Sequence, residues 1–338
     1  MSTMKADMKT WHDQVREPIV DEARAIIDPH HHLWMRPDGN DYMLEDLWDD
    51  TGSGHNIVGT VYMECGSFYY EEGPDHMKPV GESERVAAIA EESKAGAGAG
   101  RPEILAIVAK ADLTLGDRLE EVLDGHVEKS QGRFRGIRHA LSSAPDGVAL
   151  LIAGGAPKDL ASQSDFRAGV KRLGARGFTY DSWHYHLQCD DFLGLAQAYP
   201  DTQLVLDHFA TPLGVGPYAD QRDEIFAQWK SDMAKIAACD NVVAKIGGLA
   251  MPDNGFGWMG RATPATSDEL VEAQKRYYDV MIDCFGPSRC MFESNFPVDK
   301  MSLSYQVYWN GMKKIAADYS ESEQDAMFRG VASRVYSL

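Results

Sequence analysis

The stretch DPHHHLW, residues 28–34, holds three consecutive histidines directly after a short apolar run at residues 25–27. Side chains alternate across a β-strand, so His30 and His32 would point to one side of it. Two convergent imidazoles at the end of a strand can bind a divalent metal or an anionic substrate. The alternatives are a flexible histidine cluster and a purification tag, but three histidines make a poor tag and an apolar lead-in does not suit one. We therefore interpret His30 and His32 as active-site residues.

Further polar and ionisable residues follow the other strand-like segments of the chain. They are Glu64 and Cys65, then Arg135, Arg138 and His139, then Asp181, His184 and His186, then Asp207 and His208, then Lys245, and finally Glu293 and Asn295. One such residue alone would more often be a satisfied structural group. Six groups in equivalent places predict a shared site, because a barrel collects its functional side chains at the ends of different strands.

Eight apolar, strand-like segments alternate with amphipathic, helix-like segments and must position these side chains. The strand-like segments are residues 25–27, 57–63, 104–108, 134–137, 177–180, 203–206, 242–246 and 289–292. The helix-like segments include residues 82–94, 115–129, 164–173, 190–198, 220–238 and 267–284. Apolar strands alternating with helices predict a parallel sheet, and eight units predict a closed α/β fold, the (β/α)₈ TIM barrel. An open doubly wound sheet is the alternative, but it should carry a glycine-rich phosphate turn after the first strand, which this chain lacks.

We expect the barrel to span residues 25–338 as one domain after an N-terminal arm of residues 1–24. A long Gly- and Pro-rich loop, residues 252–266, follows the seventh strand and carries Phe256 and Trp258. Loops at that face often cover a site, so Trp258 is a candidate for binding a ring-shaped or apolar substrate, with loop packing as an equal alternative. The AGAGAG repeat at residues 95–100 predicts a flexible surface linker.

The composition restricts the class of protein. The 338 residues are 44% hydrophobic and 25% charged, which is enough for a large core. The formal net charge of −19 argues against nucleic acid and anionic membranes as partners. No segment approaches the ~20 apolar residues of a membrane helix, and the N-terminus lacks the apolar core of a secretory signal. Five scattered cysteines without a CxxC pair favour a reduced, cytoplasmic protein.

Five motifs resemble those of the amidohydrolase superfamily, in its amidohydrolase-2 branch of TIM-barrel metal-dependent hydrolases. The motifs are DPHHHLW, FRGIRHA, LVLDHFATPLG, VVAKIGGL and CMFESNFPVDK, and the resemblance runs from about residue 25 to residue 338. Characterised members of this branch are mostly lactonases that act on pyrone dicarboxylate, sulfomuconolactone and sugar-acid lactones. The resemblance implies a (β/α)₈ barrel that hydrolyses a cyclic ester.

The resemblance also implies a site. It places the family's H-x-H pair at His30 and His32, and its strand-six histidine at His208. These three residues would bind one divalent metal, zinc or manganese, with Glu64 or Asn295 adding an oxygen. Relatives that work without metal imply the alternative, in which the histidines and an arginine stabilise the oxyanion by hydrogen bonds.

The eighth strand departs from the family pattern. The family usually has a G-S-D-W-P type sequence there, in which the Asp is the general base, and this chain has Asn295 in that place. An amide cannot accept a proton at neutral pH, although Asn295 can still orient a water or ligate a metal. The replacement base is Glu293, Glu64, or a histidine such as His208 or His186.

The alternatives for these carboxylates are structural. Glu293 would then form a buried ion pair with Lys245, and Glu64 would accept a hydrogen bond from His30 or His32.

The resemblance places the family's strand-four arginine at Arg138, with Arg135 nearby. Arg138 is a candidate anchor for a substrate carboxylate, because a guanidinium binds a carboxylate in a bidentate manner. For Arg135 we favour the alternative, which is a salt bridge to Asp181 or Asp207. His184 and His186 alternate along a strand-like segment and are further candidates for binding substrate.

We therefore expect a lactone-opening hydrolase acting on a small lactone or carboxylated ring compound. The rivals are a metal-dependent decarboxylase of an aromatic acid, a barrel that only binds a ligand, and an amide hydrolase. A homo-oligomer is left open.

Overall fold

Eight parallel strands form one sheet in the order β1 to β8 in the computed structural model, which describes residues 3–338. The strands are β1 (Ala25–His31), β2 (Asn56–Met63), β3 (Ile104–Ala109), β4 (Phe134–Arg138), β5 (Thr179–Ser182), β6 (Leu204–Leu206), β7 (Val242–Ile246) and β8 (Cys290–Phe292). Sequential parallel pairing with helical crossovers confirms the predicted (β/α)₈ barrel.

The seam between β8 and β1 closes through the residues that follow β8. The backbone N–H of Asn295 donates to the carbonyl of His30, and that of His32 donates to the carbonyl of Phe296. Asp28 of β1 accepts hydrogen bonds from the backbone and the hydroxyl of Ser294. The seam therefore fixes the position of the histidines relative to the end of β8.

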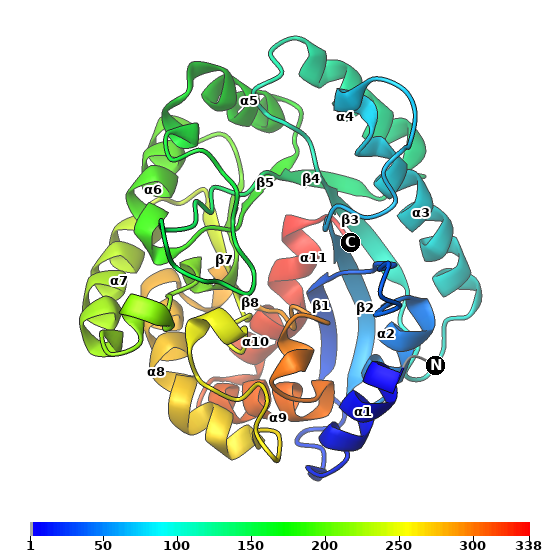
Figure 1. Cartoon of the computed structure of the whole chain (residues 1–338), viewed down its shortest axis with the longest axis vertical. Helices are drawn as coiled ribbons and strands as arrows, with labels where there is room; N and C mark the ends of the chain where they lie inside the picture. Colours follow the sequence, from blue (N-terminus) through cyan, green and yellow to red (C-terminus); the bar gives the residue numbers. More distant parts are fainter. Residues whose placement is uncertain (1–2) are drawn as a thin grey trace.

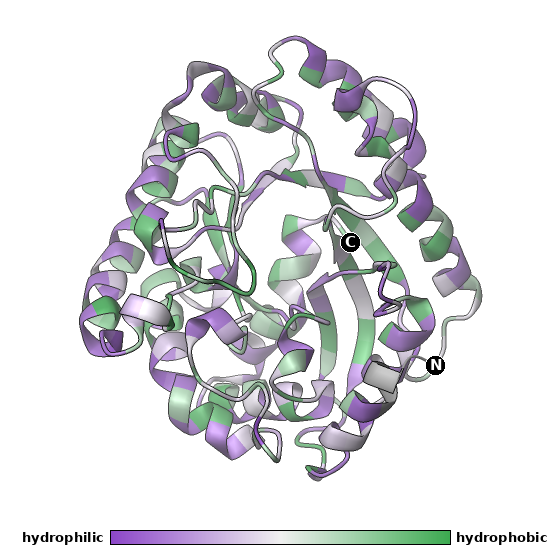
Figure 2. Ribbon diagram, viewed as in Figure 1, coloured by the Kyte–Doolittle hydropathy of each residue, from purple (hydrophilic) through white to green (hydrophobic). Residues whose placement is uncertain are grey.

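Helices surround the strands (Figure 1). They are α3 (Val80–Ala95), α4 (Arg118–Lys129), α5 (Ser164–Ala175), α6 (Cys189–Ala198), α7 (Arg222–Ala237), α8 (Ser267–Phe285) and α9 (Tyr305–Ala316). Figure 2 shows hydrophobic and hydrophilic stretches alternating along these helices, as amphipathic helices require. Two further helices, α1 (Thr3–His12) and α2 (Leu44–Thr51), come earlier in the chain. None of the helices described is long and apolar enough to cross a membrane.

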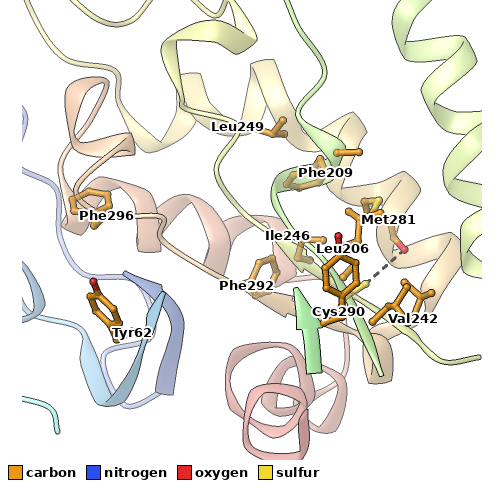
Figure 3. Packing of buried hydrophobic residues seen from close by; sticks show 14 of the residues in the cluster. Tyr62, Leu206, Phe209, Val242, Ile246, Leu249, Met281, Cys290, Phe292 and Phe296 are labelled. Carbon is orange, nitrogen blue, oxygen red and sulfur yellow. Dashed lines mark hydrogen bonds between the residues drawn. The ribbon is translucent and has the colours of Figure 1, made fainter. Parts of the chain in front are cut away.

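One apolar layer packs between the strands and the helices. Figure 3 shows Cys290 of β8 and Val242 of β7 beside Met281 of α8, and the Cys290 thiol donates to the Met281 carbonyl. Leu206, Ile246 and Phe292 belong to the same buried cluster. This layer holds each strand against its helix, which makes the strand ends a rigid support for a site.

A second apolar cluster fills the inside of the barrel. It comprises inward-facing residues of the strands, such as Val61, Val205 and Met291, together with Tyr336 from the last residues of the chain. The short helices α10 (Glu321–Asp325) and α11 (Val331–Val335) bring Tyr336 there. Arg135 donates from its Nε to the carbonyl of Tyr336, so the chain's end covers the N-terminal end of the barrel.

The AGAGAG repeat begins in α3 and continues as a turn, in which Gly98 and Arg101 exchange backbone hydrogen bonds. With the starts of β2 and β3, the turn lines an open hollow of about 780 Å³. The hollow lies at the N-terminal ends of these strands, whereas His30 and His32 lie at the C-terminal end of β1.

Candidate active site

His30 and His32 lie together at the end of β1. Their ring centroids are 5.0 Å apart, whereas His31 lies on the opposite side, with its Nε2 3.1 Å from the hydroxyl of Thr60. The pairing of β1 with β2 is irregular between Asp28 and His31, where Pro29 removes a backbone donor. The alternation predicted from the sequence thus brings the two rings together.

His208 joins them through an unusual turn after β6. Four consecutive residues, His208 to Thr211, have φ angles of 53°, 57°, 52° and 34°. Left-handed backbone costs roughly 1–2 kcal/mol for each non-glycine residue, and such strain concentrates at functional sites. The turn places the ring of His208 4.4 Å from that of His30.

The carboxylate of Glu293 contacts the rings of both His30 and His208. Its Oε1 accepts a 2.6 Å hydrogen bond from Nδ1 of His208, and its Oε2 lies 2.8 Å from Nδ1 of His30. Burial raises the pKa of Glu293 to about 8, and burial lowers the pKa of His208 to about 3. A buried carboxyl group with a raised pKa, in contact with two imidazoles, is typical of a catalytic site.

The outward nitrogens of two rings carry lone pairs. Nη1 of Arg138 lies 3.4 Å from Nε2 of His30, and a guanidinium only donates, so we assign the proton of His30 to Nδ1. Nδ1 of His32 lies 2.9 Å from the carbonyl of Met63, which only accepts, so we assign the proton of His32 to Nδ1. The Nε2 of His32 is then unprotonated, like that of His30. This is the arrangement in which metal-binding histidines are held.

The compact ligand group in the described residues is not the predicted set of three histidines. Ligand atoms of His30, Asp207 and His208 lie within 4.8 Å of one another, and His32 is not a member. Asp207 is fully buried, and neither carboxylate oxygen has a hydrogen-bond partner among the residues that the structure describes. The sequence placed Asp207 among the strand-end residues of the site and as a possible partner for an arginine, but not as a metal ligand. Strand alternation would send two adjacent residues to opposite sides, and the left-handed turn at His208 overrides it.

Lys245 lies beneath this group inside the barrel. Its ammonium is 3.1 Å from Asp181 and 3.4 Å from Asp207. Asp181 also accepts a 2.6 Å hydrogen bond from the Tyr336 hydroxyl. Among the described residues, Lys245 forms its ion pairs with these two aspartates, not the expected pair with Glu293, whose oxygens face the histidines.

Arg138 and Glu64 form an ion pair across the mouth of the barrel. The Nε of Arg138 donates to the Glu64 carboxylate at 2.8 Å, and its Nη2 donates to the Glu64 carbonyl. Glu64 therefore binds Arg138, and the hydrogen bond from His30 or His32 that the sequence analysis considered is not formed.

Lys110, which follows β3, lies close enough to Glu64 and Arg138 to interact with their charges. Burial lowers the pKa of Lys110. Lys110 escaped the sequence analysis because a lone lysine after a strand carries no motif.

Arg135, His184 and His186 are not brought into this group. Arg135 binds backbone carbonyls, including that of Tyr336, at the other end of the barrel, instead of the predicted Asp181 or Asp207. His184 stacks on Phe192 with ring centroids 5.0 Å apart, and Nδ1 of His186 accepts from the backbone of Leu213. Both histidines lie in the β5–α6 loop and serve packing contacts there.

Two other predicted residues also have structural contacts. The Asn295 amide donates to Asp299 at 2.9 Å, and Asn295 has a φ of 56°. Trp258 stacks on Phe256, which packs against Tyr277 of α8. These contacts favour loop packing for Trp258. A different aromatic residue, Trp34, stacks on His32 at 6.1 Å and lies at the site.

Comparisons with known proteins identify relatives along almost the whole chain. A family model described as "Amidohydrolase" matches residues 27–338. An uncharacterised protein of Sinorhizobium fredii is 31% identical over 93% of this chain and 99% of its own. The L-fucono-1,5-lactonase of Burkholderia multivorans is 27% identical over 92% and 96%.

Solved structures share the fold. An amidohydrolase from Burkholderia multivorans with bound zinc has a TM-score of 0.72 at 23% identity, over 93% of this chain and 99% of that one. A 2,6-dihydroxybenzoate decarboxylase has a TM-score of 0.54 at 13% identity, over 94% and 100%.

Proposed function

We propose that this chain, which belongs to the amidohydrolase family, hydrolyses a lactone or a similar cyclic carbonyl compound. The observation that carries the proposal is the contact of Glu293 with both His30 and His208. This contact places a carboxylate beside His208, in a chain that has Asn295 in place of the family's usual strand-eight base.

Without a bound ion, His208 accepts a proton from water through Nε2 in the proposed reaction, while the water oxygen attacks the carbonyl carbon. Glu293, at Nδ1 of the same ring, stabilises the imidazolium that forms. The carbonyl electron pair moves to its oxygen, where the guanidinium of Arg138 stabilises the negative charge. The bond from carbon to the ring oxygen then breaks, and His208 returns the proton to that oxygen. The product is a hydroxy acid, which releases one proton at neutral pH.

The residues present also fit a divalent metal. Asp207 offers two buried oxygens without hydrogen bonds, and His30 offers an unprotonated Nε2. His30, Asp207 and His208 would hold the ion, and such a donor set suits zinc, with manganese as the alternative. A bound divalent ion supplies Lewis-acid polarisation of the carbonyl and a lower pKa for water.

The ion pair of Arg138 with Glu64 favours a neutral, hydroxyl-bearing lactone as substrate. Glu64 neutralises Arg138 and occupies two of its donors, so the predicted anchor for a substrate carboxylate is already engaged. The Glu64 carboxylate and the Lys110 ammonium can instead bind substrate hydroxyls. The lactonase relative, named for a sugar-acid lactone, supports the same class.

A panel of sugar-acid lactones, carboxylated lactones and aromatic acids tests the proposal, with a pH indicator and a CO₂ assay, each with and without chelator. We expect acid release from neutral lactones and no CO₂ from the aromatic acids. No acid release from any lactone together with CO₂ release from an aromatic acid would replace the proposal with decarboxylation.

A further inference from the structure

Asp207 is a buried carboxylate whose charge is only partly compensated. It is fully buried at the end of β6, and neither of its oxygens accepts a hydrogen bond from any described residue. An ionised carboxylate without hydrogen bonds is costly in a protein interior unless a cation or a metal is beside it. The arrangement therefore calls for a further positive group at Asp207.

The cations already in the barrel do not fill that role. Lys245 lies 3.4 Å from Asp207 but donates its hydrogen bond to Asp181, at 3.1 Å. Arg138 lies farther away, at 3.9 Å, and is held by Glu64.

Counting charges within the barrel leads to the same conclusion. Three buried carboxylates (Asp181, Asp207 and Glu293) face one buried cation, Lys245, because Arg138 is already paired with Glu64. When all of these groups are ionised, two negative charges are left uncompensated, and Asp207 is the carboxylate without hydrogen bonds to the described residues.

We infer that Asp207 is a metal ligand of this chain, forming with His30 and His208 a two-imidazole, one-carboxylate site for a divalent cation such as Zn²⁺. The set differs from the three histidines that the family resemblance implies, because Asp207 takes the place of His32. This set supplies a carboxylate ligand in a chain whose eighth strand has the neutral Asn295 in place of the family's Asp. The inference rests on the proposed function, since it names the ligands of the ion that ring opening would use.

Calorimetric titration of the chelator-stripped protein with Zn²⁺ alone tests the ligand set without any substrate. We expect one ion per chain for the wild type and affinity weakened ~10–100-fold or more for Asp207→Asn. Asp253→Asn is the matched control, because Asp253 is another buried aspartate, which accepts two backbone hydrogen bonds in the loop after β7. Its affinity for Zn²⁺ should equal that of the wild type.

A second measurement keeps the inference testable if Asp207→Asn does not fold. Anomalous diffraction from wild-type crystals soaked in Zn²⁺ should place the ion ~2.0–2.2 Å from an Asp207 oxygen. An ion bound to His32 but not Asp207, wild-type affinity in Asp207→Asn, or no ion bound would overturn the inference. Lactone hydrolysis by the metal-free protein would leave the proposed function standing, so the two failures are distinguishable.

Discussion

The two ends of the barrel are built for different tasks. At the N-terminal end, Tyr336 enters an apolar interior and its hydroxyl and carbonyl are both hydrogen-bonded. At the C-terminal end, the carboxylate of Asp207 has no hydrogen bond to residues 3–338, and His208 begins a strained left-handed turn. Satisfied groups at one end and unsatisfied, strained groups at the other indicate that stability and chemistry are separated along the barrel axis.

Lys245 lies between the two ends, and replacing it should have the largest effect on stability. In Lys245→Met, Asp181 and Asp207 lose the cation that they share in a fully buried setting. We expect the free energy of unfolding to fall by ~3–5 kcal/mol, measured by urea denaturation. Lys235→Met, which removes an ion pair between a half-exposed Lys235 and Asp232, should cost less than ~1 kcal/mol. If both variants lost the same free energy of unfolding, the ion pairs of Lys245 with Asp181 and Asp207 would not stabilise the barrel more than an ordinary surface pair.

Glu293→Gln tests whether the C-terminal end of the barrel carries the chemistry. The neutral amide cannot stabilise the imidazolium of His208 as a carboxylate does, so we expect kcat to fall ~10²-fold or more. Glu82→Gln is the control, since Glu82 is a buried carboxylate on α3 that binds Tyr62 and backbone donors. Wild-type kcat in Glu293→Gln would remove Glu293 from the mechanism.

Tyr336→Phe tests the opposite end and should have the smallest effect. The ring still fills the barrel, but Asp181 loses a hydrogen bond, which is worth ~1.5–3 kcal/mol for a charged acceptor. We expect lower stability in thermal unfolding with turnover at the wild-type level. A fall in turnover as large as that of Glu293→Gln would contradict the separation of the two ends.

The sequence predicts the fold well because the relevant signals are local. Apolar segments mark the strands within a few residues, and the period of two brings His30 and His32 together. The fifth strand ends later than predicted, at Ser182, because polar residues there are buried between neighbouring strands.

The site is predictable only in part because its pairings are not local. The left-handed turn that brings Asp207 beside His208 breaks the strand alternation. The pairing of Arg138 with Glu64 joins β4 to the end of β2, strands that are not neighbours in the sheet. Trp258 illustrates the converse, since an aromatic residue in a long loop packs on the loop itself.

The most direct measurement is proton release during lactone opening by the wild type, His208→Asn and His184→Asn. His184 is the matched control, because it is equally buried but stacks on Phe192. We expect one proton per ring opened by the wild type and His184→Asn, and a rate lowered ~10²–10⁴-fold in His208→Asn. Equal rates in the wild type and His208→Asn would contradict the account.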